Sequence, residues 1–243
     1  MIEKVRSESA NNGKLLRVAT YNIHGGLGRD GRRDMSRIAA VINDLRCRVV
    51  ALQEVLAPHG HGNDALSLLE QQTGMTGIAG ITMRSARGQF GNALLCDLPI
   101  VRVRKHDLSV HGREKRGALD VLLRRKRRQL RVLATHLGLR PYERRQQVRR
   151  LLDIVGKGEQ PDEVTIIMGD MNEWFLWGRP LRWIHANFGR AVACRTFPAD
   201  RPLLALDRIW CHPPEQLTAL APHRSRLSRV ASDHLPLVAT LAL

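Results

Sequence analysis

Apolar and polar residues recur along the first part of the chain with the periods of strands and helices. Residues 15–23 form a mainly apolar run that predicts a strand. In residues 34–45 the apolar side chains recur at intervals of three and four positions, which predicts a helix that buries one face. Residues 49–53 predict a short buried strand that ends at Glu54. The chain therefore opens with a predicted strand, helix and strand.

The rest of the chain adds more strands than helices. Asn63 is a candidate cap for a second helix that Gly74 ends, and Pro141 begins a third helix that Gly156 ends. Strands are predicted at residues 92–96, 100–108, 118–123, 130–136, 164–169, 204–210 and 235–243. No linker rich in Ser or Pro divides the sequence. We therefore expect a mobile polar tail (residues 1–13) followed by one α+β domain (residues 14–243) with sheets covered by helices.

Six polar clusters punctuate this pattern, and most of them stand at the end of an apolar run. They occupy residues 21–25, 52–55, 135–138, 169–172, 206–210 and 232–236. A lone carboxylate after a strand usually caps a turn or a helix, so each cluster alone is weak evidence. Together, however, Glu54, Asp170 and Asp233 would repel one another unless a cation lay between them. Oxygen donors of this kind suit Mg²⁺ or Mn²⁺ rather than Zn²⁺.

The chain resembles the endonuclease/exonuclease/phosphatase superfamily in an ordered set of motifs over residues 15–243: YNIHGG, LQEV, GNALL, KRGAL, THLG, GDMN, LDRIW and SDHLP. That superfamily includes DNase I-like nucleases, apurinic-site endonucleases, sphingomyelinases and inositol-polyphosphate phosphatases. The stretches GDMNEW, TFPADRPLLALDRIW and SDHLPL look most like a small bacterial branch that includes proteins linked to cardiolipin synthases. The resemblance implies an α/β fold, a four-layer αββα sandwich with two packed, mixed and mostly antiparallel β-sheets. It places the site on loops at one edge of the sandwich.

The resemblance also implies which residues hold the metal, Mg²⁺ or Mn²⁺. Glu54 matches the principal ligand, and Asn22 and Asp233 match residues beside the ion. The DNA-repair members often carry Asp two residues after the first Asn, where this chain has His24. They also use a tyrosine from the middle of the chain, which has no counterpart here. Both departures disfavour an apurinic-site endonuclease.

Catalytic roles carry over to five residues. Asp170 would orient or deprotonate the attacking water, while His136 and Asn172 would hold phosphate oxygens. His234 would contact the scissile phosphate, and Asp207 would fix its tautomer and raise its basicity. On spacing alone His136 could equally be an ordinary buried residue at a strand end. The complete motif set favours its catalytic interpretation.

Three further residues are candidates for substrate binding. Asn92 lies in GNALL, and Arg116 in KRGAL could meet a substrate phosphate or be an exposed arginine at a strand start. Trp174 opens an aromatic stretch, residues 174–177, directly after GDMN. These aromatic side chains could stack on a base, dip into lipid headgroups, or pack the start of the next helix. The sequence leaves these alternatives open.

The net charge of +16, from 39 Lys and Arg against 23 Asp and Glu, favours polyanionic partners such as DNA or an anionic membrane surface. Residues 124–128 form a basic hairpin tip that could clamp an acidic partner or simply be a solvated turn. No apolar stretch approaches the roughly 20 residues that span a bilayer, so no transmembrane segment is expected. Four cysteines without a CxxC pair, and no export signal, predict a cytoplasmic protein, peripheral at most to the membrane.

These features predict a metal-dependent phosphoester hydrolase. A phosphodiester substrate is favoured, either phospholipid-like or nucleic acid. A phosphomonoester such as an inositol phosphate is the alternative within the enzyme class. A catalytically silent module that binds polyanions is the alternative outside it. Such modules usually lack a metal ligand or the catalytic histidine, and here every motif residue is present.

Overall fold

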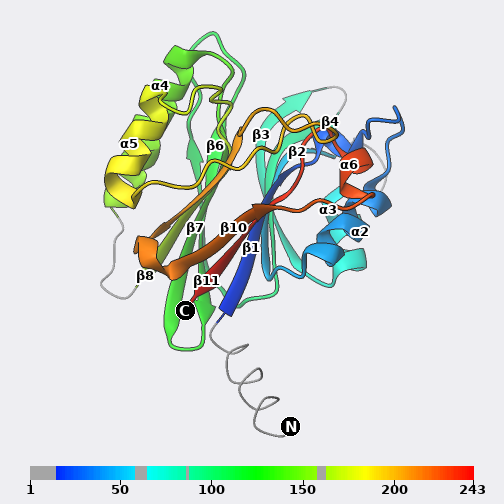
Figure 1. Ribbon diagram of the computed structural model, residues 1–243, viewed down its shortest axis with the longest axis horizontal. Helices are drawn as coiled ribbons and strands as arrows, with labels where there is room; N and C mark the ends of the chain where they lie inside the picture. Colours follow the sequence, from blue (N-terminus) through cyan, green and yellow to red (C-terminus); the bar gives the residue numbers. More distant parts are fainter. Residues whose placement is uncertain (1–14, 58–64, 86–87, 158–162) are drawn as a thin grey trace, which may run out of the picture.

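Two β-sheets dominate the computed structural model, which describes residues 15–57, 65–85, 88–157 and 163–243 (Figure 1). One sheet has six strands in the order β10-β11-β1-β2-β4-β3, and the other has five in the order β5-β6-β7-β8-β9. The first comprises β1 (Leu15–Asn22), β2 (Val49–Ala57), β3 (Thr76–Ser85), β4 (Gly88–Cys96), β10 (Leu217–Pro222) and β11 (Leu237–Ala242). The second comprises β5 (Ile100–Asp107), β6 (Gly117–Arg125), β7 (Arg128–His136), β8 (Glu163–Asp170) and β9 (Asp207–His212). Both sheets are mixed and mostly antiparallel.

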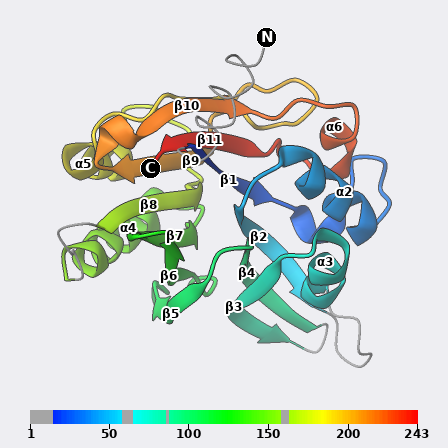
Figure 2. The same cartoon turned by 90° about the horizontal axis from the view of Figure 1, so that it is seen from below.

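Helices cover the outer face of each sheet, as Figure 2 shows. The six-stranded sheet carries α2 (Met35–Leu45), α3 (Ala65–Thr73) and the short α6 (Ser228–Ala231), while the five-stranded sheet carries α4 (Pro141–Gly156) and α5 (Arg179–Phe188). Two 3-10 turns, η1 (His24–Gly26) and η2 (Pro214–Gln216), complete the elements. This arrangement confirms the expected four-layer αββα sandwich. Among the described residues, none of the helices is long and apolar enough to cross a lipid bilayer.

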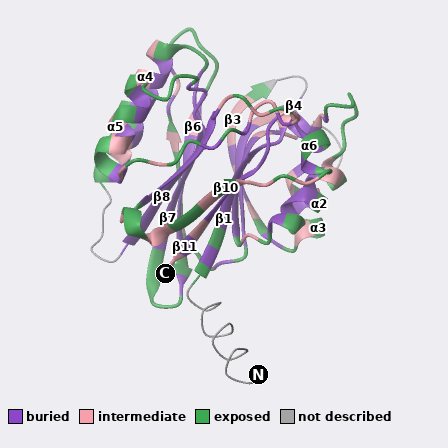
Figure 3. Ribbon diagram, viewed as in Figure 1, coloured by how far each residue is buried: buried purple, intermediate pink, exposed green. Residues whose placement is uncertain are grey.

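The largest core lies between the two sheets. It is built from alternate residues of each strand, because successive side chains of a strand point to opposite faces. Its members include Val18 on β1, Leu94 on β4, Val132 on β7, Ile166 on β8 and Ile209 on β9. Two smaller cores lie under the helices on the outer faces. Figure 3 shows the result, with buried strands inside and helices that expose their outer sides.

Several sequence predictions of elements need correction. β2 does not end at Glu54 but continues to Ala57 through a bulge, and the strand predicted at 204–210 begins only at Asp207. The strands β3 and β10 were not predicted. The proposed Asn63 cap and the tail at residues 1–13 lie outside the described residues.

Gly169 illustrates how closely the strands approach one another beneath the site. It has φ of 151°, and a Cβ atom there would overlap the carbonyl oxygen of Thr135 on the neighbouring strand β7. We expect Gly169→Ala to lower the free energy of unfolding by about 3 kcal/mol, because backbone atoms cannot move aside as a flexible side chain can. Chemical denaturation measures this.

Gly156→Ala is the matched control, since a Cβ at Gly156 meets nothing within 4 Å. That variant should be as stable as the wild type or slightly more stable. Equal stability of the two alanine variants would show that the strands β7 and β8 do not need this close approach.

Candidate active site

The apolar core between the sheets becomes polar at one edge of the sandwich. Asn22, Asn92, His136, Asp170 and Asp207 occupy strand positions in phase with the apolar residues that face the core. All five are nine-tenths or more buried. The strand register aligns three of them, because His136 is paired with Asp170 and Asp170 with Asp207 across β7, β8 and β9. The strand alternation that builds the core therefore also gathers these polar groups.

Glu54 joins this group through the bulge in β2. The register with β4 shifts between Leu52 and Val55, and Glu54 has a φ of 57°. A bulge of this kind re-aims a side chain that would otherwise point to the opposite face. The Nδ2 atom of Asn22 then donates to Glu54 Oε1 at 3.0 Å and to Asp170 Oδ2 at 3.1 Å. Asn22 thus joins a carboxylate of each sheet.

The carboxylates of Glu54, Asp170 and Asp233 repel one another electrostatically. Burial raises the pKa of Glu54, and the charges of Asp233 and Asp170 raise it further against the hydrogen bond from Asn22. Asp233 is about one-third exposed, and its Oδ1 lies 3.8 Å from Nδ1 of His24. Three carboxylates that repel one another in a half-buried space fit a bound divalent cation. Glu54 and Asp233 supply oxygen donors of the required type, whereas the Oδ1 of Asn22 accepts from the His24 amide.

Asp170, Asp207 and His234 form a second group that could hold a cation, because their donor atoms lie within 4.8 Å of one another. In this group, however, His234 Nδ1 lies 2.8 Å from Asp207 Oδ2, so the histidine and the carboxylate already satisfy each other. The geometry therefore favours a histidine–carboxylate pair here. The mutually repelling carboxylates around Glu54 are the better cation site.

The Asp207–His234 pair is buried and firmly held. Thr196 Oγ1 donates to Asp207 Oδ2 at 2.5 Å, and the ring of Phe197 packs 4.8 Å from that of His234. Burial opposes a charge on His234, but the adjacent Asp207 carboxylate outweighs it and raises the pKa of His234 to about 10. The imidazole is therefore protonated at neutral pH, with Nε2 3.7 Å from Asp170 Oδ2. Thr196 and Phe197 open the stretch TFPADRPLLALDRIW, but the sequence assigned neither of them a role.

Replacing Asp207 by asparagine should lower the pKa of His234 from about 10, because the burial cost remains while the Asp207 charge and its hydrogen bond are lost; Asp170 and Asp233 still raise it. A raised pKa in the folded state stabilises the protein fully below about pH 6.5, and this contribution fades as the pH rises through about 10. The loss of Tm in Asp207→Asn should therefore be largest near pH 6 and smallest near pH 10. An NMR titration of the His234 ring checks the pKa directly. An unchanged pKa in Asp207→Asn would disprove the pairing.

His136 has the opposite character. Burial lowers its pKa to about 3, and the nearby Arg116 lowers it further against the attraction of Asp170. Arg116 Nη1 lies 3.0 Å from His136 Nδ1, and Asn172 Nδ2 lies 3.0 Å from His136 Nε2. Nε2 also lies 3.6 Å from Asp170 Oδ2. His136 therefore stays neutral between Arg116 and Asn172, and Arg116, which is 7% exposed, is no surface arginine.

Two asparagines complete the polar edge. Asn172 has a φ of 49°, its amide N–H donates to Asp170 Oδ1, and its side chain donates to the Leu137 carbonyl. Asn92 donates from β4 to the Gly117 carbonyl at 3.1 Å, which joins the two sheets beside Arg116. The site therefore brings together every residue predicted for metal binding and catalysis, with Asn92 and Arg116 at its border.

The residues after Asn172 are exposed, which excludes the interpretation that they pack the next helix. Trp174, Phe175, Leu176 and Trp177 expose 51–71% of their surface. Phe175 and Trp177 contact each other with ring centroids 5.5 Å apart. The segment is held at its base by Glu173, which accepts from the Phe175 amide and from Arg144. It leaves an apolar rim directly beside the polar edge.

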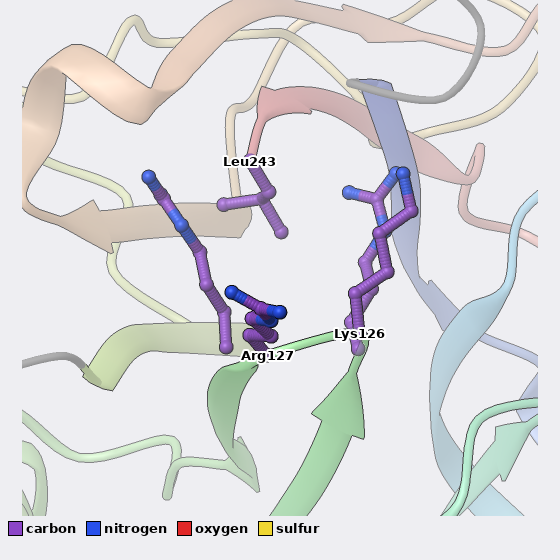
Figure 4. Close-up of a pocket in the computed structure, with 5 residues that line it drawn as sticks. Lys126, Arg127 and Leu243 are labelled. Atoms are coloured by element: carbon purple, nitrogen blue, oxygen red, sulfur yellow. The ribbon is translucent and has the colours of Figure 1, made fainter.

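The basic hairpin does not belong to this site. Its tip joins β6 to β7 and, with Leu243, lines a hollow at the lower end of the molecule (Figures 1 and 4). Arg128 and His136 stand at opposite ends of β7, and the eight residue-to-residue steps between them span roughly 27 Å. An acidic partner bound at the hairpin tip would therefore lie far from His136. It would not be the group that reacts at the candidate active site.

Comparison with known proteins gives a clear family match. Residues 19–234 match the model of the endonuclease/exonuclease/phosphatase family. The chain is 31% identical to the uncharacterized protein YbhP of Escherichia coli K12, over 94% of this chain and 96% of that protein. The match spans both sheets and all motif residues from Asn22 to His234.

Solved structures share the fold. An endonuclease/exonuclease/phosphatase from Beutenbergia cavernae superimposes with a TM-score of 0.75 at 23% identity, over 95% of this chain and 72% of that one. A second from Bacteroides vulgatus gives a TM-score of 0.75 at 18% identity, over 94% and 99%. TDP2 from D. rerio, solved with a single-strand DNA product, gives 0.66 at 17% identity, over 93% and 98%.

Proposed function

Because the chain belongs to the endonuclease/exonuclease/phosphatase family, we propose that it is a Mg²⁺- or Mn²⁺-dependent phosphodiesterase. Glu54 and Asp233 would hold the ion, with Asn22 fixing the position of the Glu54 carboxylate. When bound, the ion neutralises charge that develops on the phosphate oxygens. Members of this family are phosphoester hydrolases, so the proposal concerns the metal and the diester preference.

The side chains of this site have complementary tasks in such a reaction. Asp170 accepts hydrogen bonds from Asn22 and from the Asn172 amide, and in this proposal its Oδ2 orients the attacking water and accepts its proton. His234 donates from Nε2 to a phosphate oxygen. His136 and Asn172, whose Nε2 and Nδ2 atoms lie 3.0 Å apart, hold further phosphate oxygens. The attack of water on phosphorus is then in line with the departing oxygen.

The placement of two buried imidazoles on one carboxylate oxygen is the observation that carries this proposal. Two buried imidazoles flank one carboxylate oxygen at 3.6 and 3.7 Å, one with its pKa lowered to about 3 and the other raised to about 10. Environments that separate pKa values in this way are typical of sites that move protons. A module that only binds polyanions would gain nothing from a neutral histidine beside a cationic one.

The exposed apolar rim supports a diester whose leaving group carries an apolar or aromatic part. Trp174 and its neighbours begin two residues after Asn172, within reach of a substituent on the phosphate. A phospholipid and a nucleic acid both offer such a group, through acyl chains or bases. An inositol phosphate offers none, which places the phosphomonoester alternative second.

The proposal is tested by hydrolysis of a bis-aryl phosphodiester beside the corresponding aryl monoester, followed by abasic DNA, plasmid DNA, cardiolipin and inositol phosphates. In ¹⁸O-labelled water the aryl phosphomonoester formed from the diester should carry one labelled oxygen from the solvent, and the released phenol none. Turnover of the diester supports the proposal, and the panel then identifies the substrate. Turnover of the monoester alone would make the protein a phosphatase. Tight binding of DNA or lipid without any turnover would make it a binding module.

A further inference from the structure

A second hollow lies on the outer face of the five-stranded sheet, between β9, α5 and residues 190–193. It measures about 310 Å³, the lower end of the range for ligand sites, and is lined by Arg208, His185 and Arg190 together with Leu176, Val192 and two alanines. The described residues that line it include no carboxylate. Its charged groups are thus all cationic or able to become so.

Arg208 is the unusual member of this set. The residue is 97% buried, yet its Nε and Nη2 atoms have no hydrogen-bond partner among the described residues. A buried donor without a partner costs about 1–3 kcal/mol, and more when the group is charged. Such a group requires a partner that the described residues do not supply, such as a water, an ion or a ligand.

The neighbouring carboxylates do not satisfy Arg208. Asp207 precedes it on β9, so its side chain points to the opposite face of the sheet, towards His234. Glu173 is the other acid near enough to act on Arg208, and its oxygens accept from Arg144 and from the Phe175 amide. Arg208 instead faces α5, as does Trp210, whose ring lies 5.8 Å from that of His185.

His185 and Arg190 line the same hollow and add further hydrogen-bond donors to it. Burial lowers the pKa of His185, and the charges of Arg208 and Arg190 lower it further. The ring is therefore neutral at pH 7 and can donate one N–H. Arg190 is exposed at the mouth of the hollow, where its guanidinium can close on an entering group.

We propose that Arg208, Arg190 and His185 form a second anion-binding site, separate from the active site, that takes a phosphate-type oxyanion. Arginine binds such an ion through paired N–H groups, and the apolar wall of Leu176 and Val192 accepts part of its substituent. The oxyanion is either a free phosphate ion or a second phosphate group of the substrate. Leu176 belongs to the apolar rim that starts at Asn172, so the two sites share one segment of chain.

The experiment follows His185 in the intact protein by ¹H–¹⁵N NMR of the imidazole ring, with sodium phosphate as the probe and sodium chloride at equal ionic strength as the reference. The absence of the signal in His185→Gln assigns it. We expect a saturable shift of the His185 signal and a rise of its pKa. Asn172→Ala, which alters the active site, should leave this response unchanged, so the result does not depend on catalysis.

Three variants test whether the NMR shift of His185 comes from phosphate bound in this hollow. Arg190→Gln and Arg208→Met should weaken phosphate binding at least ten-fold, whereas Arg182→Gln, an exposed arginine of α5 outside the hollow, should not. Arg190 is exposed, so its variant should fold even where Arg208→Met does not. No saturable shift, or equal affinity in the wild type and Arg190→Gln, would overturn the proposal.

A second arm, which rests on the proposed function, separates the two sources of the oxyanion. It compares kcat/KM for a phosphodiester with and without a second phosphate group. If the site holds a substrate phosphate, Arg190→Gln lowers kcat/KM about ten-fold for the first substrate alone. Equal values for both substrates, with the NMR shift retained, assign the site to a free phosphate ion.

Discussion

Replacing Asp170 by asparagine should lower kcat/KM for a phosphodiester by about 10³-fold, because a positioned general base contributes between 10² and 10⁴. Asp170 Oδ2 lies at the centre of the site, 3.1 Å from Asn22 Nδ2 and 3.6 and 3.7 Å from the two histidine Nε2 atoms. An amide has nearly the same shape but cannot take a proton from water. Its NH₂ group would also face other donors.

The fold should survive this change. Asp170 is one of the charges that raise the pKa of Glu54, so removing it relieves repulsion in the same half-buried space. Asp170→Asn should therefore stay folded with a Tm close to that of the wild type, because the relieved repulsion with Glu54 offsets the lost contacts with Asn22 and His234. Asp153→Asn, an exposed position on α4, is the matched control and should change neither Tm nor kcat/KM. An Asp170→Asn variant with more than a tenth of wild-type activity would remove Asp170 from the reaction.

Replacing His234 by alanine should have a similar effect, about 10³-fold on kcat/KM, because it removes the cationic donor to the phosphate. Asp207 acts through His234, to which it is bonded at 2.8 Å, so Asp207→Asn alone should cost less, about 10- to 100-fold. The double variant should then be no worse than His234→Ala alone, since groups that act as a unit are not additive.

A double-mutant cycle of kcat/KM measures this coupling. His111→Ala, at an exposed position that belongs to no motif, should retain full activity. Additive losses in the cycle would mean that Asp207 has a task of its own. Metal-dependent turnover that survives His234→Ala would eliminate the role assigned to the histidine.

The sequence predicted which polar residues lie together at this edge, because each of several apolar strands ends in one of them. A run of inward apolar residues that ends in Asn22, His136 or Asp170 shows where the core stops, and the ordered motifs supply the partners. Elements without such a signal were missed. β3 contains Gly77 and Gly80 among mixed residues, and β10 is a short, half-exposed edge strand, so neither has the alternation that predicts a strand.

Contacts that depend on the tertiary fold could not be predicted from the sequence. The bulge that re-aims Glu54 depends on the register of β2 against β4, and a single strand does not reveal its partner's register. His136 is contacted by Arg116 and Asn172, twenty and thirty-six positions away, and Asp207 accepts a hydrogen bond from Thr196 on a loop. The unpartnered guanidinium of Arg208 is visible only once β9 and α5 are packed together.

The most direct test of the central claim is the rate of bis-aryl phosphodiester hydrolysis by the wild-type protein with Mg²⁺, with Mn²⁺ and with EDTA. We expect turnover with either cation, none with EDTA, and recovery when the cation is restored in excess. Glu54→Gln should require a higher cation concentration for half-maximal rate, because it loses the charged ligand. Turnover that persists in EDTA, or no turnover with either cation, would contradict a metal-dependent phosphodiesterase.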